Sequence, residues 1–273
     1  MTIKDIFNLP DYTNSYKRVI LDQEPDFFVF ENVKGLWSTK KHRIEYDKLK
    51  KSFKRKGYIL IDKLVNSLDY GVPQERERII LFGIKYLLIS DNSKEALAIL
   101  KNGFTWGTNE KFCKEQRDLC NWPDTDEFHE NSFKEQPKEI LPEITVEYWF
   151  NKNQVETHYN SSDFFNPRSI DRFYKIAEGD IKKKSFKRLH RWRYSPTAAY
   201  GNNEVHLHPY KARRLSVAEA LAIQSLPKEY VVCKELSKSS MFKTIGNGVP
   251  FLMSKGIAKA IRLFMEENVK KDT

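Results

Sequence analysis

Short apolar runs in the first third of the chain limit its possible folds more than any other feature. They read "FFVF" from Phe27, "YILI" from Tyr58 and "RIILFGI" from Arg78, and each has the length of a β-strand. Between the first two, residues 43–56 space apolar side chains among charges as a surface helix does, and Gly57 follows as a helix stop. The order strand, helix, strand, loop, strand predicts an α/β sheet.

The middle of the chain, residues 90–210, lacks this order. It is rich in Asn, Asp, Lys and Trp and has no repeat, which predicts an irregular insertion or a small second domain. Beyond it, Ser216 and Glu219 form a capping-box pattern at the start of a helix. A last helix follows Pro250, a residue suited to a first helical turn.

The composition indicates the kind of partner and compartment. The chain has 273 residues, with 47 Lys and Arg against 37 Asp and Glu, a net charge of +10 and a pI near 9.3. This excess favours a polyanionic partner, with nucleic acid ahead of a membrane surface. We find no apolar run long enough for a transmembrane helix, no apolar signal core and too few cysteines for a disulfide framework. We therefore expect a cytoplasmic protein without a membrane partner.

Four stretches occur in a fixed order along the chain. They are "FFVFENVKG", "LDYGVPQERERIILFGI", "ARRLSVAEALAIQSLP" and "IGNGVP". Together they resemble the later motifs of the DNA (cytosine-5)-methyltransferases, bacterial members of which commonly belong to restriction–modification systems. The resemblance implies an α/β fold: the C-terminal part of a Rossmann-like methyltransferase sheet that depends on S-adenosylmethionine, with an inserted irregular target-recognition domain. Residues 1–89 would be part of the catalytic domain, residues 90–210 the target-recognition domain, and residues 211–273 helices returning to the catalytic domain.

The first two stretches would carry the catalytic groups. Methylation at C5 of cytosine needs a nucleophile on C6 and a proton donor near N3, and a carboxyl ending a buried strand can hold that proton. Glu31 matches the family's acid, and Arg78 matches the arginine that hydrogen-bonds the cytosine O2. Gln74 and Arg76 would order the surrounding loop. A solvated charged turn is the alternative for "QERER", but its place directly before an apolar strand disfavours it.

The resemblance also assigns the cofactor and the nucleic acid. Asn247 and Val249 lie in a turn that, in the family, contacts S-adenosyl-L-methionine; an ordinary helix start is the alternative. The target cytosine of double-stranded DNA must leave the base stack for this chemistry. The stretch "RLHRWRYSPTAAYG" resembles the end of the family's target-recognition region, and its basic and aromatic residues suit DNA contact. The candidate DNA-binding residues are Arg188, Arg191, Arg193, Ser195 and Thr197. Arg191 and Arg193 could each pair with a guanine, and phosphate contact or surface charge is the alternative for either one.

Two motifs of the family are absent from this sequence. The glycine-rich cofactor turn and the Pro-Cys loop should precede "FFVFENVKG", but no glycine precedes Gly35 and none of Cys113, Cys120 and Cys233 follows a proline. We therefore expect activity only with an N-terminal methyltransferase subunit that carries the nucleophilic cysteine. An inactive remnant that binds DNA remains open, whereas a basic RNA-binding protein is disfavoured by the catalytic motifs. Without the missing strands, residues 27–31 should form an exposed apolar edge that favours self-association.

Overall fold

The computed structural model describes residues 12–167, 169–183, 185–198, 200 and 205–270. It divides into two compact units. The first holds the described residues up to Val65, Glu77–Trp106 and those from Ala260 onward; the second holds Asn66–Arg76 and Gly107–Lys259. In this division the helices that follow residue 211 group with the middle region as far as Lys259.

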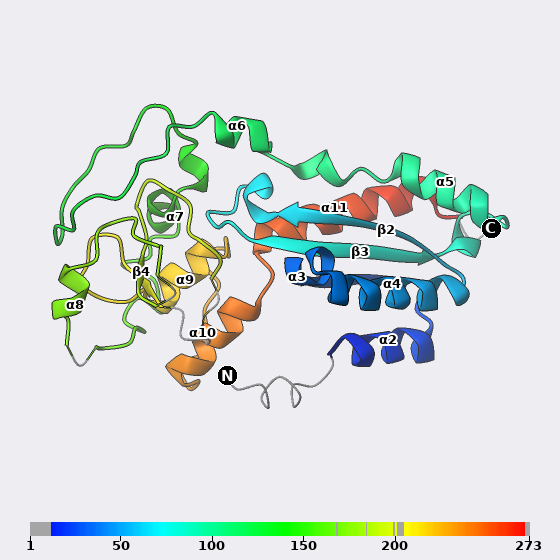
Figure 1. Ribbon diagram of the computed structural model, residues 1–273, viewed down its shortest axis with the longest axis horizontal. Coiled ribbons are helices and arrows are strands. Elements are labelled where there is room, and N and C mark those ends of the chain that lie inside the picture. Colours follow the sequence, from blue (N-terminus) through cyan, green and yellow to red (C-terminus); the bar gives the residue numbers. More distant parts are fainter. Residues whose placement is uncertain (1–11, 168, 184, 199, 201–204, 271–273) are drawn as a thin grey trace. The chain divides into compact units, whose positions relative to one another are not determined.

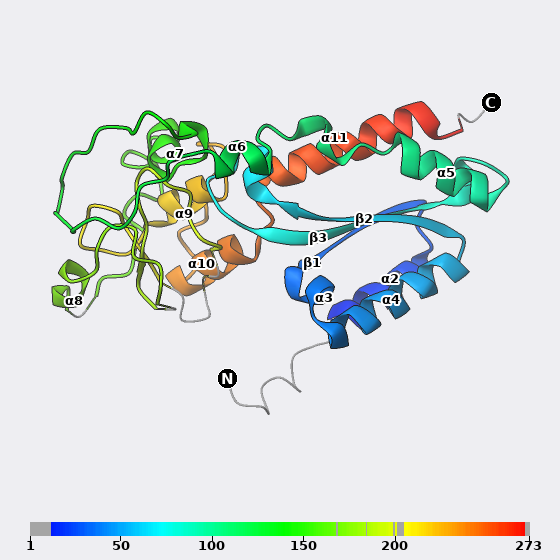
Figure 2. The same ribbon diagram turned by 45° about the horizontal axis from the view of Figure 1, so that its top comes forward.

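A three-stranded sheet forms the centre of the first unit. Its strands are β1 (Phe27–Val33), β2 (Tyr58–Asn66) and β3 (Glu77–Lys85), and their spatial order is β1-β3-β2; Figure 1 labels β2 and β3, and Figure 2 labels β1 as well. β1 runs antiparallel to β3, and Glu31 lies opposite Ile80. The unit is therefore mixed α/β, as the apolar runs predicted.

Helices cover both faces of this sheet (Figure 2). α2 (Tyr12–Gln23) and α4 (Lys40–Arg55) lie on one face, while α5 (Ser93–Gly103) and the C-terminal part of α11 (Phe251–Asn268) lie on the other. The short helix α3 (Lys34–Ser38) directly follows β1. The α2/α4 face is filled by a buried cluster that includes Ile20, Phe28, Phe30, Tyr46, Leu49, Phe53 and Leu81.

Aromatic side chains line the face of the sheet that α5 and α11 cover. The ring centroids of Phe82 and Phe104 are 5.4 Å apart, and Phe264 of α11 lies 6.3 Å from Phe82. Because side chains alternate along a strand, the even-numbered residues of β3 point to this face and the odd-numbered ones to the other. Gly83, an odd-numbered residue of β3, belongs to the other face, which α2 and α4 cover. An added Cβ at this position would come within 2.4 Å of the Phe28 ring.

β1 is one of the two edge strands of the described sheet, and apolar side chains lie along it. Phe27, Val29 and Val33 are 42%, 40% and 52% exposed. The backbone carbonyl of Val29 accepts a hydrogen bond from the Tyr16 hydroxyl of α2. The exposed apolar edge that the sequence predicted is present in the structure.

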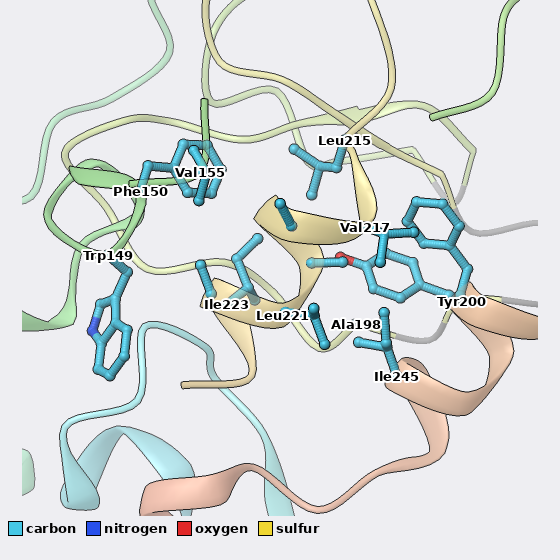
Figure 3. Close-up of a cluster of buried hydrophobic side chains, with 14 of the residues drawn as sticks. Trp149, Phe150, Val155, Ala198, Tyr200, Leu215, Val217, Leu221, Ile223 and Ile245 are labelled. Atoms are coloured by element: carbon cyan, nitrogen blue, oxygen red, sulfur yellow. The ribbon is translucent and has the colours of Figure 1, made fainter. Parts of the chain in front are cut away.

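The second unit is organised around α9 (Val217–Ile223), all of whose residues are buried. Figure 3 shows Leu221 and Ile223 of this helix among side chains from α7 (Val146–Lys152) and α10 (Lys238–Asn247). The predicted capping box is confirmed: the Ser216 hydroxyl accepts from the Glu219 amide, and the Glu219 carboxylate accepts from the Ser216 amide.

Outside this core the second unit has few regular elements. Its remaining ones are α6 (Lys114–Asp118), α8 (Asp171–Tyr174) and the parallel pair β4 (Lys187–Arg188) and β5 (His206–Leu207). Single 3-10 turns lie at Ser67–Tyr70, Trp106–Asn109 and Pro142–Ile144, and a further one in the first unit lies at Tyr86–Leu88. The irregular character of this region agrees with its sequence.

A histidine lies in the interior of the second unit without a hydrogen-bond partner. Neither ring nitrogen of His206 is paired within the described residues, and its ring meets that of buried Tyr200 edge-on at 5.3 Å. Burial, with a smaller contribution from Lys187, lowers the pKa of His206 to about 3. The folded protein therefore holds this imidazole neutral.

This histidine predicts an acid sensitivity. Between pH 6.5 and about 3 the unfolded chain binds a proton at His206 that the folded chain does not, so the free energy of unfolding falls as the pH falls through this range. His206→Leu should reduce that slope by up to about 1.4 kcal/mol per pH unit. Urea denaturation at several pH values measures it. His129→Leu, at an exposed histidine, is the control; equal slopes for the wild type and His206→Leu would contradict the assignment.

The edge strand predicts self-association of the isolated chain. Val29→Lys places a charge on the exposed edge of β1 and should lower the sedimenting mass of the preparation, because charged side chains oppose edge pairing. Val19→Lys, at a 53% exposed position of α2, adds the same charge away from the strand. Analytical ultracentrifugation compares the two. A wild-type chain that sediments as a monomer would argue against the proposed edge pairing.

Candidate active site and nucleic-acid interface

The register of the sheet brings Glu31 and Arg78 together in the first unit. Val33 lies opposite Arg78 and Glu31 opposite Ile80, so Glu31 and Arg78 are diagonal neighbours on the same face. The Arg78 Nε lies 2.9 Å from Glu31 Oε1. Two residues predicted to share the cytosine site are thus paired by strand geometry alone.

The ion pair is partly open to solvent. The side chain of Arg78 is 11% exposed and that of Glu31 is 31% exposed. Burial lowers the pKa of the Arg78 guanidinium, and the charge of Glu31 partly offsets this. The guanidinium also donates to the Glu77 carbonyl, which fixes it against β3.

Gln74 lies in the second unit, in the loop that connects β2 to β3, and it is fully buried. Its Oε1 accepts from the Ala198 amide at 2.9 Å, and its Nε2 donates toward the Ile223 carbonyl and the Gln224 side chain. The Ser67 hydroxyl donates to its backbone carbonyl. The amide therefore connects the loop to α9 and to the segment around residue 198.

Arg76, like Gln74, is buried in the second unit and hydrogen-bonded there. Its guanidinium donates to the carbonyls of Ala198 and Gly246, at 3.2 and 3.1 Å. Only 3% of the residue is exposed, so it is fixed inside the second unit. Gln74 and Arg76 thus hold the loop, and neither presents its polar group at the surface.

The third stretch forms a buried ion pair that the sequence did not predict. Arg213 donates to both carboxylate oxygens of Glu219, at 2.9 and 2.7 Å, while the same carboxylate caps α9. Glu219 is 1% exposed. One feature of the sequence could have predicted this ion pair. An arginine stands six residues before a glutamate that belongs to a capping box. The pair joins the chain before α9 to the helix itself.

Two of the predicted DNA-binding arginines serve the interior instead. Arg188 is fully buried, its guanidinium lies 3.7 Å from the Phe128 ring centroid, and burial lowers its pKa to about 10. Its donors are used by the backbone carbonyls of Phe173, Ile176, His208 and Lys211. Arg191 is 3% exposed and pairs with buried Glu178, Nε to Oε1 at 2.8 Å. In this arrangement neither side chain is free to reach DNA.

The other three candidates are also tied to the protein. Ser195 is completely buried, and its hydroxyl donates to the Pro196 carbonyl. The Thr197 hydroxyl donates to the Glu75 carbonyl at 2.7 Å, next to the Gln74 contacts. Arg193 is half-buried and donates from Nη1 to the Pro123 carbonyl. Of the five, Arg193 and Thr197 retain some surface, whereas the other three have almost none.

The "IGNGVP" turn joins α10 to α11. Asn247 is the last residue of α10; it is exposed, and its side chain forms no hydrogen bond within the described part of the chain. Val249 is half-buried. At Gly246 an added Cβ would lie 2.9 Å from the Tyr200 backbone nitrogen, so only glycine permits this close approach.

The cysteines and acidic residues offer few other chemical sites. Cys113 and Cys233 are exposed, and burial raises the pKa of the Cys120 thiol, which disfavours its thiolate. Ligand atoms of Glu156, His208 and Glu219 lie within 4.8 Å of one another. Lys211 and Arg213 already neutralise the two carboxylates, so the group is a salt-bridged cluster. None of the described helices is long and apolar enough to cross a membrane.

Known proteins resemble this chain over most of its length. The pattern of the C-5 cytosine-specific DNA methylase family matches residues 12–263. The Type II methyltransferase M.NmeDI of Neisseria meningitidis serogroup C is 51% identical over 261 residues, which are 95% of this chain and 59% of that protein. M.Bpa9945I of Bacillus paralicheniformis is 27% identical over 90% of this chain and 62% of its own length. The chain thus spans about three fifths of the length of these relatives.

Solved structures share the fold. A crystal structure described as a prophage-encoded DNA modification methyltransferase (E. coli) has a TM-score of 0.55 at 20% identity, over 95% of this chain and 76% of that one. The methyltransferase EhMeth of Entamoeba histolytica has a TM-score of 0.53 at 12% identity, over 97% of this chain and 71% of its own. The chain belongs to the C-5 cytosine-specific DNA methylase family.

The pair of Arg213 and Glu219 predicts a large stability effect. Arg213→Gln leaves the Glu219 carboxylate buried without its bidentate partner, and the free energy of unfolding should fall by about 3–5 kcal/mol. Arg214→Gln, at the adjacent arginine, is the matched control because no carboxylate pairs with it in the described structure, and it should cost much less. Urea denaturation of both variants measures the difference. Equal losses would contradict the structural role of the pair.

Proposed function

We propose that this chain is the acid-bearing part of a DNA (cytosine-5)-methyltransferase of a restriction–modification system. The observation that carries the proposal is the Glu31–Arg78 pair, which the β1–β3 register places on one face of the sheet. Family membership supports the reaction class. The methyl group would go from S-adenosyl-L-methionine to C5 of a cytosine flipped out of double-stranded DNA.

Glu31 and Arg78 would act on the cytosine ring. Addition of a nucleophile at C6 pushes electrons toward N3 and O2, so a proton near N3 and a cation near O2 stabilise the product of addition. Glu31 would supply the former and Arg78 the latter. Their present ion pair would then open as the base enters, which frees the guanidinium for O2 and the carboxyl for N3.

The chain's own contribution to cofactor binding would be small. The Asn247 amide, which forms no hydrogen bond to any described residue, and the half-buried Val249 side chain are suited to contact S-adenosyl-L-methionine at the turn before α11. The cofactor, when bound, supplies the methyl group. Most of its pocket, including the glycine-rich turn, would be formed by residues outside this sequence.

The nucleophile would likewise come from elsewhere. None of Cys113, Cys120 and Cys233 stands in a Pro-Cys loop, and burial of Cys120 disfavours its thiolate. We propose that an N-terminal methyltransferase subunit provides the cysteine and adds its strands at the exposed edge of β1. The irregular part of the second unit would be an inserted target-recognition domain, and the first unit the corresponding part of a Rossmann-like sheet.

A second candidate is a remnant that binds DNA without catalysis. The intact Glu31–Arg78 pair favours an active subunit over this candidate. The two differ in whether methyl transfer appears when the missing half is supplied.

Reconstitution tests the proposal. The chain is mixed with the N-terminal part of the Neisseria meningitidis relative, and transfer of a labelled methyl group to DNA is measured. Glu31→Gln should lower the rate by about a hundredfold or more, since it removes the proton donor. Glu45→Gln, on the exposed surface of α4, should not change it. No transfer by the wild-type pair would favour the remnant, and undiminished transfer by Glu31→Gln would refute the acid assignment.

A further inference from the structure

The guanidinium of Arg214, in the second unit, has no hydrogen-bond acceptor within the described residues. The Arg214 guanidinium lies 5.1 Å from the Phe165 ring centroid and 5.9 Å from that of Phe186. Its side chain forms no hydrogen bond or ion pair within the described residues. Burial lowers the pKa of Arg214, and no acidic group offsets that effect. The charge is thus partly desolvated without compensation, an unfavourable arrangement unless an anion binds there.

A second cation lies on the same ring. The guanidinium of exposed Arg172 lies 4.7 Å from the Phe186 centroid, and within the described structure it too has no carboxylate partner. Two cations therefore lie near the Phe186 ring. The ring attracts each of them by a cation–π interaction, but the two positive charges repel each other. An anion between or beside them would relieve the repulsion.

The backbone at this ring is strained. Phe186 has a φ of +58°, in the left-handed region that bulky residues rarely adopt. Its ring contacts Phe173 at 5.5 Å, so the strained residue is held in place by packing. Strain of this kind costs about 1–3 kcal/mol and clusters at functional positions. The strained conformation places the ring where both arginines meet it.

The contrast with the other arginines of the unit decides the argument. Arg188 gives its donors to backbone carbonyls, and Arg191 and Arg213 are neutralised by Glu178 and Glu219. These side chains stabilise the fold. Arg172 and Arg214 use none of their donors within the described chain, although guanidinium groups match phosphate oxygens well.

We propose that Arg172 and Arg214, supported by the rings of Phe186 and Phe165, bind phosphate groups of the DNA backbone. The inference rests on the proposed function in that it takes double-stranded DNA as the partner. Neither arginine is among the five candidate DNA-binding residues that the sequence indicated, although Arg214 belongs to the third of the four family stretches. The site positions the duplex and carries no sequence information of its own, because phosphates are alike at every base pair.

Salt dependence of DNA binding tests the site with the full chain. Fluorescence anisotropy gives the affinity for two unrelated duplexes at several salt concentrations. Arg172→Gln and Arg214→Gln should each make the slope of log K against log salt less negative by about 0.9 and weaken binding to both duplexes by roughly tenfold near 0.1 M salt. Arg262→Gln removes the same charge from α11, outside the second unit, and should change neither.

Two further readouts keep the result decisive. Arg214→Lys retains the charge and should keep the wild-type slope, and thermal denaturation confirms that each variant is folded. Unchanged slopes in Arg172→Gln and Arg214→Gln would overturn the proposal, as would a loss of preference between duplexes with the slope intact, which indicates base reading. If the unaltered chain binds no duplex DNA, the proposed function and this inference both fail; if it binds and only the variants behave as wild type, the inference alone fails.

Discussion

The pairing register of β1 against β3 is the constraint on which the candidate active site depends. With Val33 opposite Arg78, the side chains of Glu31 and Arg78 share a face and meet at 2.9 Å. A slip of one residue would turn Glu31 toward the opposite, apolar face, where Phe28 and Phe30 pack against α4. The apolar alternation of β1 therefore fixes the position of the acid, because burial of those two phenylalanines is worth several kcal/mol.

Four arginines of the second unit point into the protein. Arg76, Arg188, Arg191 and Arg213 supplement its hydrophobic core in a region with little regular structure, and each donates to backbone carbonyls or to a buried carboxylate. A loop-rich domain leaves many carbonyls without secondary-structure partners, and the five-donor guanidinium can bind several of them at once. The net charge of +10 therefore includes arginines that are held inside the protein and are not available to a polyanion.

Local features could be predicted from the sequence, whereas contacts between residues far apart along the chain could not. The strand at Phe27, the surface helix before Gly57 and the Ser216–Glu219 capping box depend on neighbouring residues, and the structure contains all of them. The burial of Arg188 and Arg191 could not be predicted, since their acceptors lie 12 or more residues away in irregular chain. Likewise, the Gln74 side chain bonds to residues about 150 positions later, a pairing that only the fold defines.

The central claim is that the sheet itself couples Glu31 to Arg78. A double-mutant cycle tests it most directly, with the free energies of unfolding of Glu31→Gln, Arg78→Gln and the double variant measured against the wild type. The account predicts that the single effects do not add, with a coupling energy of about 0.5–3 kcal/mol, because contacting residues interact. Effects that add within experimental error would mean that the two side chains are independent, and the paired site would be refuted.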